Sequence, residues 1–255
     1  LLDREVFELG FTATPVITQD MTLASGALSG LTLGGRAVEI GTGAGRLEGG
    51  ALAAQFALRD VTGPAAGEAI DAFAAEIIGR FEAAGLDPTL TPGDPGLFTD
   101  AGAALDPLAT EGLATRIAVN PTVDPAAGGE LWRLRDGLGA TVEGTAGDAS
   151  LLNALLAAAT TPSAPPTATG VSGAHGLADL AGALTGLAVQ SASETDESAA
   201  YLLGQAASFR DAELASVGVD TDSELQKLLV IERTYAANAR VIETLDGLLA
   251  RLLEI

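Results

Sequence analysis

The sequence predicts an α+β fold that is mainly helical, with long coiled-coil-like helices and a small β-rich part at the N-terminal end. Over much of residues 47–255, apolar residues recur at steps of three and four, a spacing typical of amphipathic helices. Residues 1–46 contain short apolar runs separated by Gly. The pattern changes near Gly49 and again near Asp220, which predicts three regions in the 255 residues: 1–46, 47–219 and 220–255.

The first region is expected to form short strands. The runs Val6–Phe11 and Thr14–Ile17 are largely apolar. The stretch Gly30–Ile40 predicts a hairpin that turns at Gly34-Gly35, because two glycines between short apolar runs are a typical hairpin connection.

The second region is expected to begin with two helices. The first covers Ala51–Val61, and the second follows Thr62-Gly63-Pro64 and stops at Gly85. The stretch Asp87–Asp100 is dense in Pro, Gly and Asp and predicts a loop.

The rest of the second region alternates irregular and helical segments. Residues 101–147 are expected to be irregular apart from short pieces around Ile117–Val119 and Leu131–Leu134. A helix is predicted over Asp148–Ala159, and a Pro/Ser/Thr-rich linker over Ala159–Gly170. A long helix from Leu177 to Ser216 is then expected, with a coiled-coil-like seam that turns polar in its middle.

Composition excludes several function classes. The formal net charge of −21 leaves no basic patch for phosphates, so nucleic-acid binding is not expected, and an anionic membrane surface would repel the chain. There is no cysteine, which removes disulfides, thiolate nucleophiles and cysteine metal sites. No stretch is long and apolar enough to predict a membrane span.

Three features are candidates for chemistry, and each has a simpler interpretation. The single histidine, His175, lies between Gly173 and Gly176 without a partner nearby in sequence, as a surface histidine does. The glycine-rich stretch Gly41–Gly50 departs from a dinucleotide-binding turn at Arg46, and a connector is the better interpretation. The loop carboxylates Asp87, Asp94 and Asp100 could hold a cation but are better explained as solvated turn residues. We therefore expect that the protein is not an enzyme and that it has no catalytic residue, metal site or cofactor.

The strongest signal is the terminal segment, Asp220–Ile255. From Ser223 on it predicts a helix roughly 50 Å long, at 1.5 Å per residue. Thr221 followed by Glu224 predicts a capping box at its start. The apolar arc is wider than a two-stranded seam needs, so the helix must be covered from more than one side; a long helix within the protein's own core is the alternative. The predicted subunit-interface residues are Leu225, Leu228, Tyr235, Asn238, Ile242, Leu245, Leu248, Leu249, Leu252 and Leu253.

This segment also carries a resemblance. The run Glu232–Ile242, followed by Thr244, Asp246 and Leu248-Leu249, resembles the C-terminal signature shared by bacterial flagellar rod, hook and hook-associated proteins. Further upstream, several stretches resemble the hook-associated protein 1 family, whose members join the hook to the filament: Gly49–Leu52, Phe56–Asp60, Gly85-Leu86 and Phe98.

The resemblance implies a structural subunit, exported through the flagellar type III pathway, in an extracellular ring of copies of itself. Its implied partners are the hook protein, a second hook-associated protein or flagellin on the filament side, and an export chaperone. Residues 220–255 would belong to an inner core domain, residues 47–219 to a middle domain, and residues 1–46 to an outer domain, in flagellin-like rod layers. Because the N-terminal helix that pairs with the terminal one in that family has no counterpart in this sequence, the resemblance also implies the C-terminal half of such a protein.

Two alternatives remain open. A hook or rod protein would carry the same terminal signature with more β structure upstream. An acidic secreted surface or adhesion protein that oligomerises through its terminal helix belongs to another class.

Overall fold

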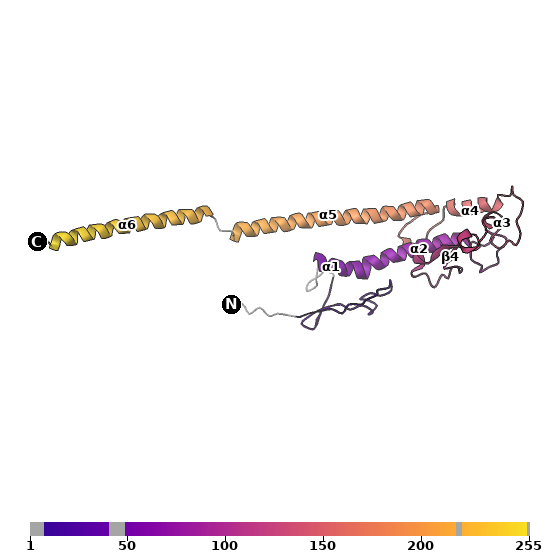
Figure 1. The fold of residues 1–255 in the computed structure, drawn as a ribbon, viewed down its shortest axis with the longest axis horizontal. Coiled ribbons are helices and arrows are strands. Elements are labelled where there is room, and N and C mark those ends of the chain that lie inside the picture. The colour runs from indigo at the N-terminus through magenta and orange to yellow at the C-terminus, as the bar shows by residue number, and fades with distance from the viewer. Residues whose placement is uncertain (1–7, 41–48, 218–220, 254–255) are drawn as a thin grey trace. The chain divides into compact units, whose positions relative to one another are not determined.

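The computed structural model describes residues 8–40, 49–217 and 221–253, and its fold is α+β and mainly helical (Figure 1). The chain divides into two units, residues 1–189 and 190–255, called here the N-terminal and C-terminal units. The division falls inside one long helix.

The predicted hairpin is confirmed. A three-stranded antiparallel sheet has the order β1 (Leu9–Gly10), β2 (Leu31–Leu33), β3 (Arg36–Val38). Gly34 and Gly35 connect β2 and β3 with φ of 57° and 77°, a conformation that glycine adopts without steric cost. Residues 14–17, predicted to be β, contain no strand. The part of Val6–Phe11 before Glu8 lies outside the described residues.

A continuous helical rod follows, where the sequence predicted two helices with a break. Helix α1 (Gly50–Ala57) passes through a π-helical turn, η1 (Leu58–Thr62), into α2 (Gly63–Phe81). Pro64 has no N–H to give to the preceding turn, and a wider turn is one way in which a helix accommodates that loss. The predicted break is therefore wrong, and a local widening takes its place.

Helix α2 organises the core of the N-terminal unit. Its buried Ala74 and Ile78 pack with Leu113, and Phe98 packs against this cluster from β4 (Phe98–Asp100). Strand β4 pairs with β5 (Ile117–Val119), so the end of the predicted loop 87–100 is a strand. One-turn 3₁₀ helices flank β5 at Leu113–Thr115 (η2) and Pro125–Ala127 (η3).

Buried carboxylates fix the loops around α2. Asp71 accepts hydrogen bonds from the backbone N–H groups of Gly112 and Ala114, both at 2.7 Å. Asp87 accepts one from Leu138 at 2.7 Å and two from Thr89. Because each buried carboxylate is satisfied by hydrogen bonds from elsewhere in the chain, long irregular segments hold a defined path.

Two shorter helices lie at the far end of α2. These are α3 (Arg133–Asp136) and α4 (Ser150–Thr160), which contact one another, and α4 also contacts α2 (Figure 1). The prediction of a helix over Asp148–Ala159 is confirmed with a small shift.

The base of the longest helix, α5 (Leu177–Val217), is clamped to α2. Arg80 forms an ion pair with Glu76 at 2.7 Å and donates hydrogen bonds to the carbonyl oxygens of Thr161 and His175. Glu76 also accepts a hydrogen bond from the Ser163 hydroxyl. The backbones of Ser163 and His175 form an antiparallel bridge, and His175 lies two residues before α5 begins. The 3₁₀ helix η4 (Thr167–Thr169) lies between these two residues in sequence and contacts α2.

The last helix is α6 (Thr221–Leu253). Together α5 and α6 confirm the predicted long helices. The boundaries 1–46, 47–219 and 220–255 stay predictions as domain limits.

Candidate assembly surface

The distal part of α5 and all of α6 present their side chains to solvent. Every described side chain from Thr185 to Leu249 is exposed, apart from the half-buried Ser223. By contrast, Leu180 near the base of α5 is fully buried. The packing of the N-terminal unit therefore ends within the first two turns or so of α5.

The exposed apolar side chains of α6 are large. They are exposed by 51% to 77%, the extremes being Leu229 and Tyr235. Monomeric soluble proteins rarely leave such a contiguous apolar surface in water, and large exposed patches mark interaction sites. We define the assembly surface as the exposed apolar side chains of α6.

A heptad pattern organises this surface. Leu228, Tyr235, Ile242 and Leu249 are seven residues apart, and Ile231, Asn238 and Leu245 fall between them at steps of three and four. A repeat averaging 3.5 residues is the pattern of a helix that supercoils around another helix. We call these seven positions the seam. Asn238 is the only polar residue among them, and a lone seam amide can fix the register of a helical partner.

The predicted interface residues lie on this helix. Leu225, Leu228, Tyr235, Asn238, Ile242, Leu245, Leu248 and Leu249 are all exposed. Leu252 and Leu253 belong to the last turn of α6, and their side chains lie outside the described residues. Their role in an interface remains a prediction.

The predicted capping residues lie at the start of α6. The helix begins at Thr221, and Glu224 in its first turn forms an ion pair with Lys227 at 2.7 Å. The Thr221 side chain lies outside the described residues, so the capping box remains a prediction.

Distal α5 is also apolar, but on several sides. Tyr201, Leu202 and Leu203 are consecutive, so they point in three directions around the helix, and all are more than half exposed. Phe209 and Leu214 extend this surface toward the C-terminal end of α5.

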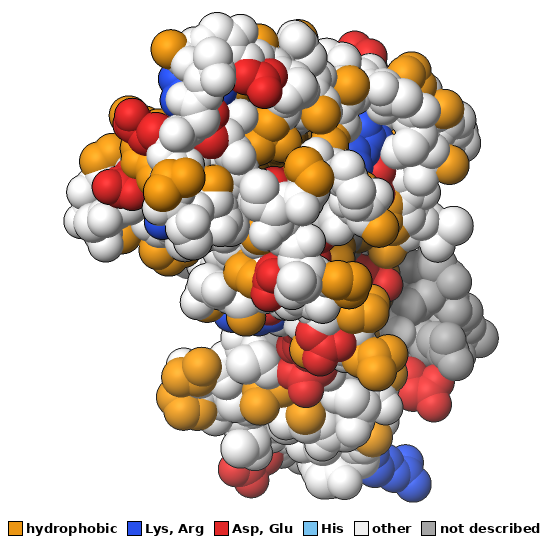
Figure 2. Space-filling model, turned by 90° about the vertical axis from the view of Figure 1, so that its right-hand side faces the viewer, with side chains coloured by type: hydrophobic (Ala, Val, Ile, Leu, Met, Phe, Trp, Pro, Cys, Tyr) orange, Lys and Arg blue, Asp and Glu red, His pale blue; other side chains and the backbone are white. Residues whose placement is uncertain are grey.

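The N-terminal unit differs from α6 in its charge. Figure 2 views the end where α3 and α4 lie, and on this face Asp and Glu side chains lie among hydrophobic ones and outnumber Lys and Arg. Residues 1–189 contain 22 acidic and 8 basic residues, whereas residues 221–255 contain 6 and 4. The chain therefore joins a strongly acidic body to a nearly neutral helix.

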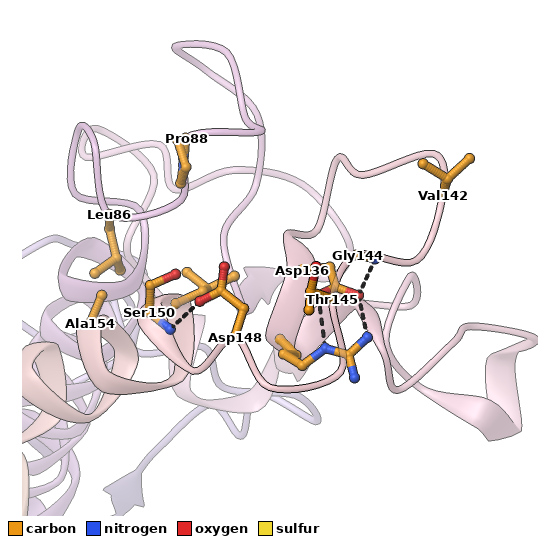
Figure 3. A pocket seen from close by; sticks show the side chains of 11 residues that line it. Leu86, Pro88, Asp136, Val142, Gly144, Thr145, Asp148, Ser150 and Ala154 are labelled. Carbon is orange, nitrogen blue, oxygen red and sulfur yellow. Dashed lines mark hydrogen bonds and ion pairs between the residues drawn. The ribbon is translucent and has the colours of Figure 1, made fainter.

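A surface pocket of about 440 Å³ lies between the loops near α3 and the start of α4 (Figure 3). Its carboxylates are engaged within the chain. Asp136 pairs with Arg135 at 2.6 Å and accepts a hydrogen bond from the Gly144 N–H at 2.9 Å, and Asp148 accepts one from the Ser150 N–H. These contacts tie the loop between α3 and α4 to both carboxylates, which gives each of them a structural role.

This contact network predicts a pH-dependent loop. The Arg135 hydrogen bonds, followed by the Gly144 N–H, lower the pKa of Asp136 from 3.8 to about 2. A depressed carboxylate pKa stabilises the fold above the unfolded-state value, and that contribution is lost as the pH falls through the folded-state value. We expect the Gly144 amide proton shift, followed by NMR, to titrate with a midpoint near pH 2; a midpoint near pH 3.8 would contradict the contact. In Asp136→Asn this transition should disappear.

The other candidates of the sequence have structural roles. The ring of His175 contacts the Ser172 carbonyl oxygen at 3.0 Å, and its backbone belongs to the α5 base. Asp94 accepts hydrogen bonds from Thr91, and Asp100 pairs with Arg116 at 2.7 Å. The interpretation of Asp87 as a solvated turn residue is wrong, because it is buried beneath the loop that it anchors.

No cluster of potential metal ligands occurs within residues 8–40, 49–217 and 221–253. Most of Gly41–Gly50, which includes Arg46, lies outside this description. None of the helices described is both long and apolar enough to cross a membrane.

Sequence reasoning missed the Arg80–Glu76 clamp. Glu76 and Arg80 are four residues apart on a predicted helix, and this spacing predicts an ion pair between them. It does not predict the hydrogen bonds from Arg80 to the carbonyl oxygens of Thr161 and His175.

Comparison with known proteins places the clearest likeness at the C-terminal end. Residues 212–255 match the family described as flagellar basal body rod FlgEFG protein C-terminal. The matched segment includes the end of α5 and α6, and so contains the whole assembly surface. No curated protein and no solved structure matches the chain significantly. The family match supports a structural component of the bacterial flagellum of the rod and hook type.

Proposed function

We propose that the chain is a hook-associated protein of the hook–filament junction that assembles by packing α6 against helices of neighbouring subunits. One observation carries the proposal: the segment that matches the flagellar family contains α6, and the large apolar side chains of α6 are exposed. A helix of this kind is stable in an assembly, where other subunits remove its seam from water.

The helical body favours a hook-associated protein over a rod or hook protein. Most of α5, a helix of 41 residues, and the continuous rod from Gly50 to Phe81 lie upstream of the matched segment. Strands in the described part of the chain are at most three residues long. The resemblance described above implies long helices in the middle region of a hook-associated protein, and more β structure in a rod or hook protein.

A rod or hook protein is the second candidate, because the matched family itself is that of rod proteins. Both candidates share the further features of the proposal. The chain is a structural protein rather than an enzyme, exported to the flagellum, and packed against copies of itself. Its other partners are hook protein, a second hook-associated protein or flagellin, and an export chaperone.

Under this proposal the three sequence regions are layers. Residues 220–255 form the inner core, residues 47–219 the middle layer and residues 1–46 the outer part. The acidic surface of the N-terminal unit suits a solvent-facing layer, since strong net charge opposes nonspecific association.

Deleting the gene in the source organism separates the candidates. A junction protein is needed for the filament but not for the hook, so we expect cells with hooks, without filaments, that release filament subunits into the medium. Electron microscopy of isolated basal bodies and immunoblots of the medium give the result. Loss of the hook together with the filament would identify a rod or hook protein, and normal filaments would contradict both candidates. Reintroduction of the intact gene is the control.

A further inference from the structure

Most of the ten basic side chains that the structure describes are paired with carboxylates of the same chain. Six of them form ion pairs with carboxylates, namely Arg59, Arg80, Arg116, Arg133, Arg135 and Lys227. Across the side chains that the structure describes, four arginines form no ion pair: Arg36, Arg210, Arg233 and Arg240. Two of these four lie on α6.

Arg233 and Arg240 form a stripe on one side of α6. They are seven residues apart, which places them nearly in line about 10 Å apart along the helix. Both are exposed and lie on the side opposite the seam. We call them the basic stripe.

Two carboxylates form a second line on the same helix. Glu232 and Glu243 are eleven residues apart, close to three full turns, so they too are nearly in line. Both are exposed, and within the described residues neither has an ion pair or a side-chain hydrogen bond. This acidic stripe is roughly 90° from the basic stripe around the helix, at 100° per residue.

A solvated helix face usually pairs such charges internally. Elsewhere the chain does so at i, i+3 or i, i+4, as in Glu76–Arg80, Glu130–Arg133 and Glu224–Lys227. Arg233 has no carboxylate three or four residues away in either direction. Its charge is therefore free to pair with a carboxylate of another helix.

Charge also favours α6 as the place where copies meet. Two copies of a chain with net charge −21 repel one another through their acidic bodies. Residues 221–255, with 6 acidic and 4 basic residues, are close to neutral, and α6 carries charges of both signs in separate lines.

We propose that the basic stripe of α6 in one copy docks on the acidic stripe of α6 in a second copy, an interface that rests on the self-assembly proposed above. With two parallel helices at equal height, Arg233 lies one residue from the level of Glu232 and Arg240 three residues from that of Glu243, an axial offset of at most about 5 Å. Arginine and glutamate side chains span such offsets across a helix–helix contact of 8–10 Å, a typical interaxial distance.

The contact is heterologous, because each copy uses two different surfaces. Contacts of this kind continue from copy to copy and build a ring or a filament rather than a closed pair. The seam faces away from the basic stripe, so it remains available to a different helix. The docking therefore sets how copies stand beside one another, while the seam supplies apolar burial.

Complementary charge reversals test this docking in the full chain. R233E/R240E makes both stripes acidic, and E232R/E243R makes both basic. We expect each variant alone to associate about a hundredfold more weakly than wild type, because like charges then face one another. An equimolar mixture of the two should recover association, since each acidic copy can dock on a basic one. Sedimentation velocity measures association, and circular dichroism checks that helix content is unchanged.

The design separates this inference from the proposed function. The two variants shift net charge in opposite directions, so loss in both cannot come from net charge alone. R36E, in β3 and outside the stripes, is the single-reversal control and should associate as wild type does. Variants that associate normally, or a mixture no better than its components, would overturn the docking and leave the proposed function standing. A wild-type chain that stays monomeric at the highest concentrations would contradict self-assembly itself.

Discussion

Shortening two seam leucines, in L245A/L249A, should reduce self-association about a thousandfold. Each leucine is more than half exposed in the described chain and would be buried against another helix on assembly. Losing that burial costs about 2 kcal/mol per leucine, and every 1.4 kcal/mol corresponds to a factor of ten in affinity. Sedimentation velocity over a concentration series gives the ratio.

Thr244→Ala is the matched control, because Thr244 neighbours Leu245 in sequence and lies off the seam. It should associate within about threefold of wild type. Because both changes lie outside the core of the N-terminal unit, the thermal unfolding of that unit should be the same in all three proteins. Equal association of L245A/L249A and wild type would rule out the seam as an interface.

Arg80→Ala should lower the free energy of unfolding of the N-terminal unit by about 3–5 kcal/mol, the usual cost of removing one partner of a buried ion pair. The side chain of Arg80 is only 9% exposed, and its removal leaves Glu76 without its cation. It also removes the Arg80 hydrogen bond to the carbonyl oxygen of Thr161 and one of the two hydrogen bonds to that of His175, which keeps the Ser163 N–H as a donor. Urea denaturation of the full chain provides the measurement.

A second readout distinguishes the clamp from general stability. The His175 N–H donates to the Ser163 carbonyl oxygen at the base of α5, so its hydrogen exchange reports on that base directly. We expect this amide to lose more protection than the amides of β4 and β5. Arg36→Ala, an exposed arginine outside the clamp, should leave both stability and exchange unchanged. A uniform loss of protection would argue against a specific role in holding α5.

The sequence predicted the helices better than the contacts between them. Helix α5 was predicted to within a residue because apolar residues at helical spacing lie on both sides of its polar middle and no proline interrupts it. The continuation of α1 into α2 was missed because Gly63 and Pro64 are strong local breakers, and only the packing of α2 shows that the helix persists. Strand β4 was missed because its pairing partner, Ile117–Val119, lies beyond a long loop.

The candidate surface was predictable in outline. The apolar arc of α6 could be read from the sequence, but its exposure could not, since the same pattern fits a helix buried within a core. The roles of Asp71, Asp87 and Arg80 depend on backbone groups 41 to 95 residues away. No local sequence pattern specifies such distances.

The two units also differ in how fast they can form. The solvent-exposed helices between Thr185 and Leu249 are held by backbone hydrogen bonds that join residues four apart. Helices of this kind form and melt within about a microsecond. The N-terminal unit depends on contacts such as Arg80 with His175, 95 residues apart, and long-range contacts slow folding. If the subunit is exported as proposed above and leaves the export channel as an unfolded chain, the helical segments of α5 and α6 would therefore form before the core of the N-terminal unit has folded.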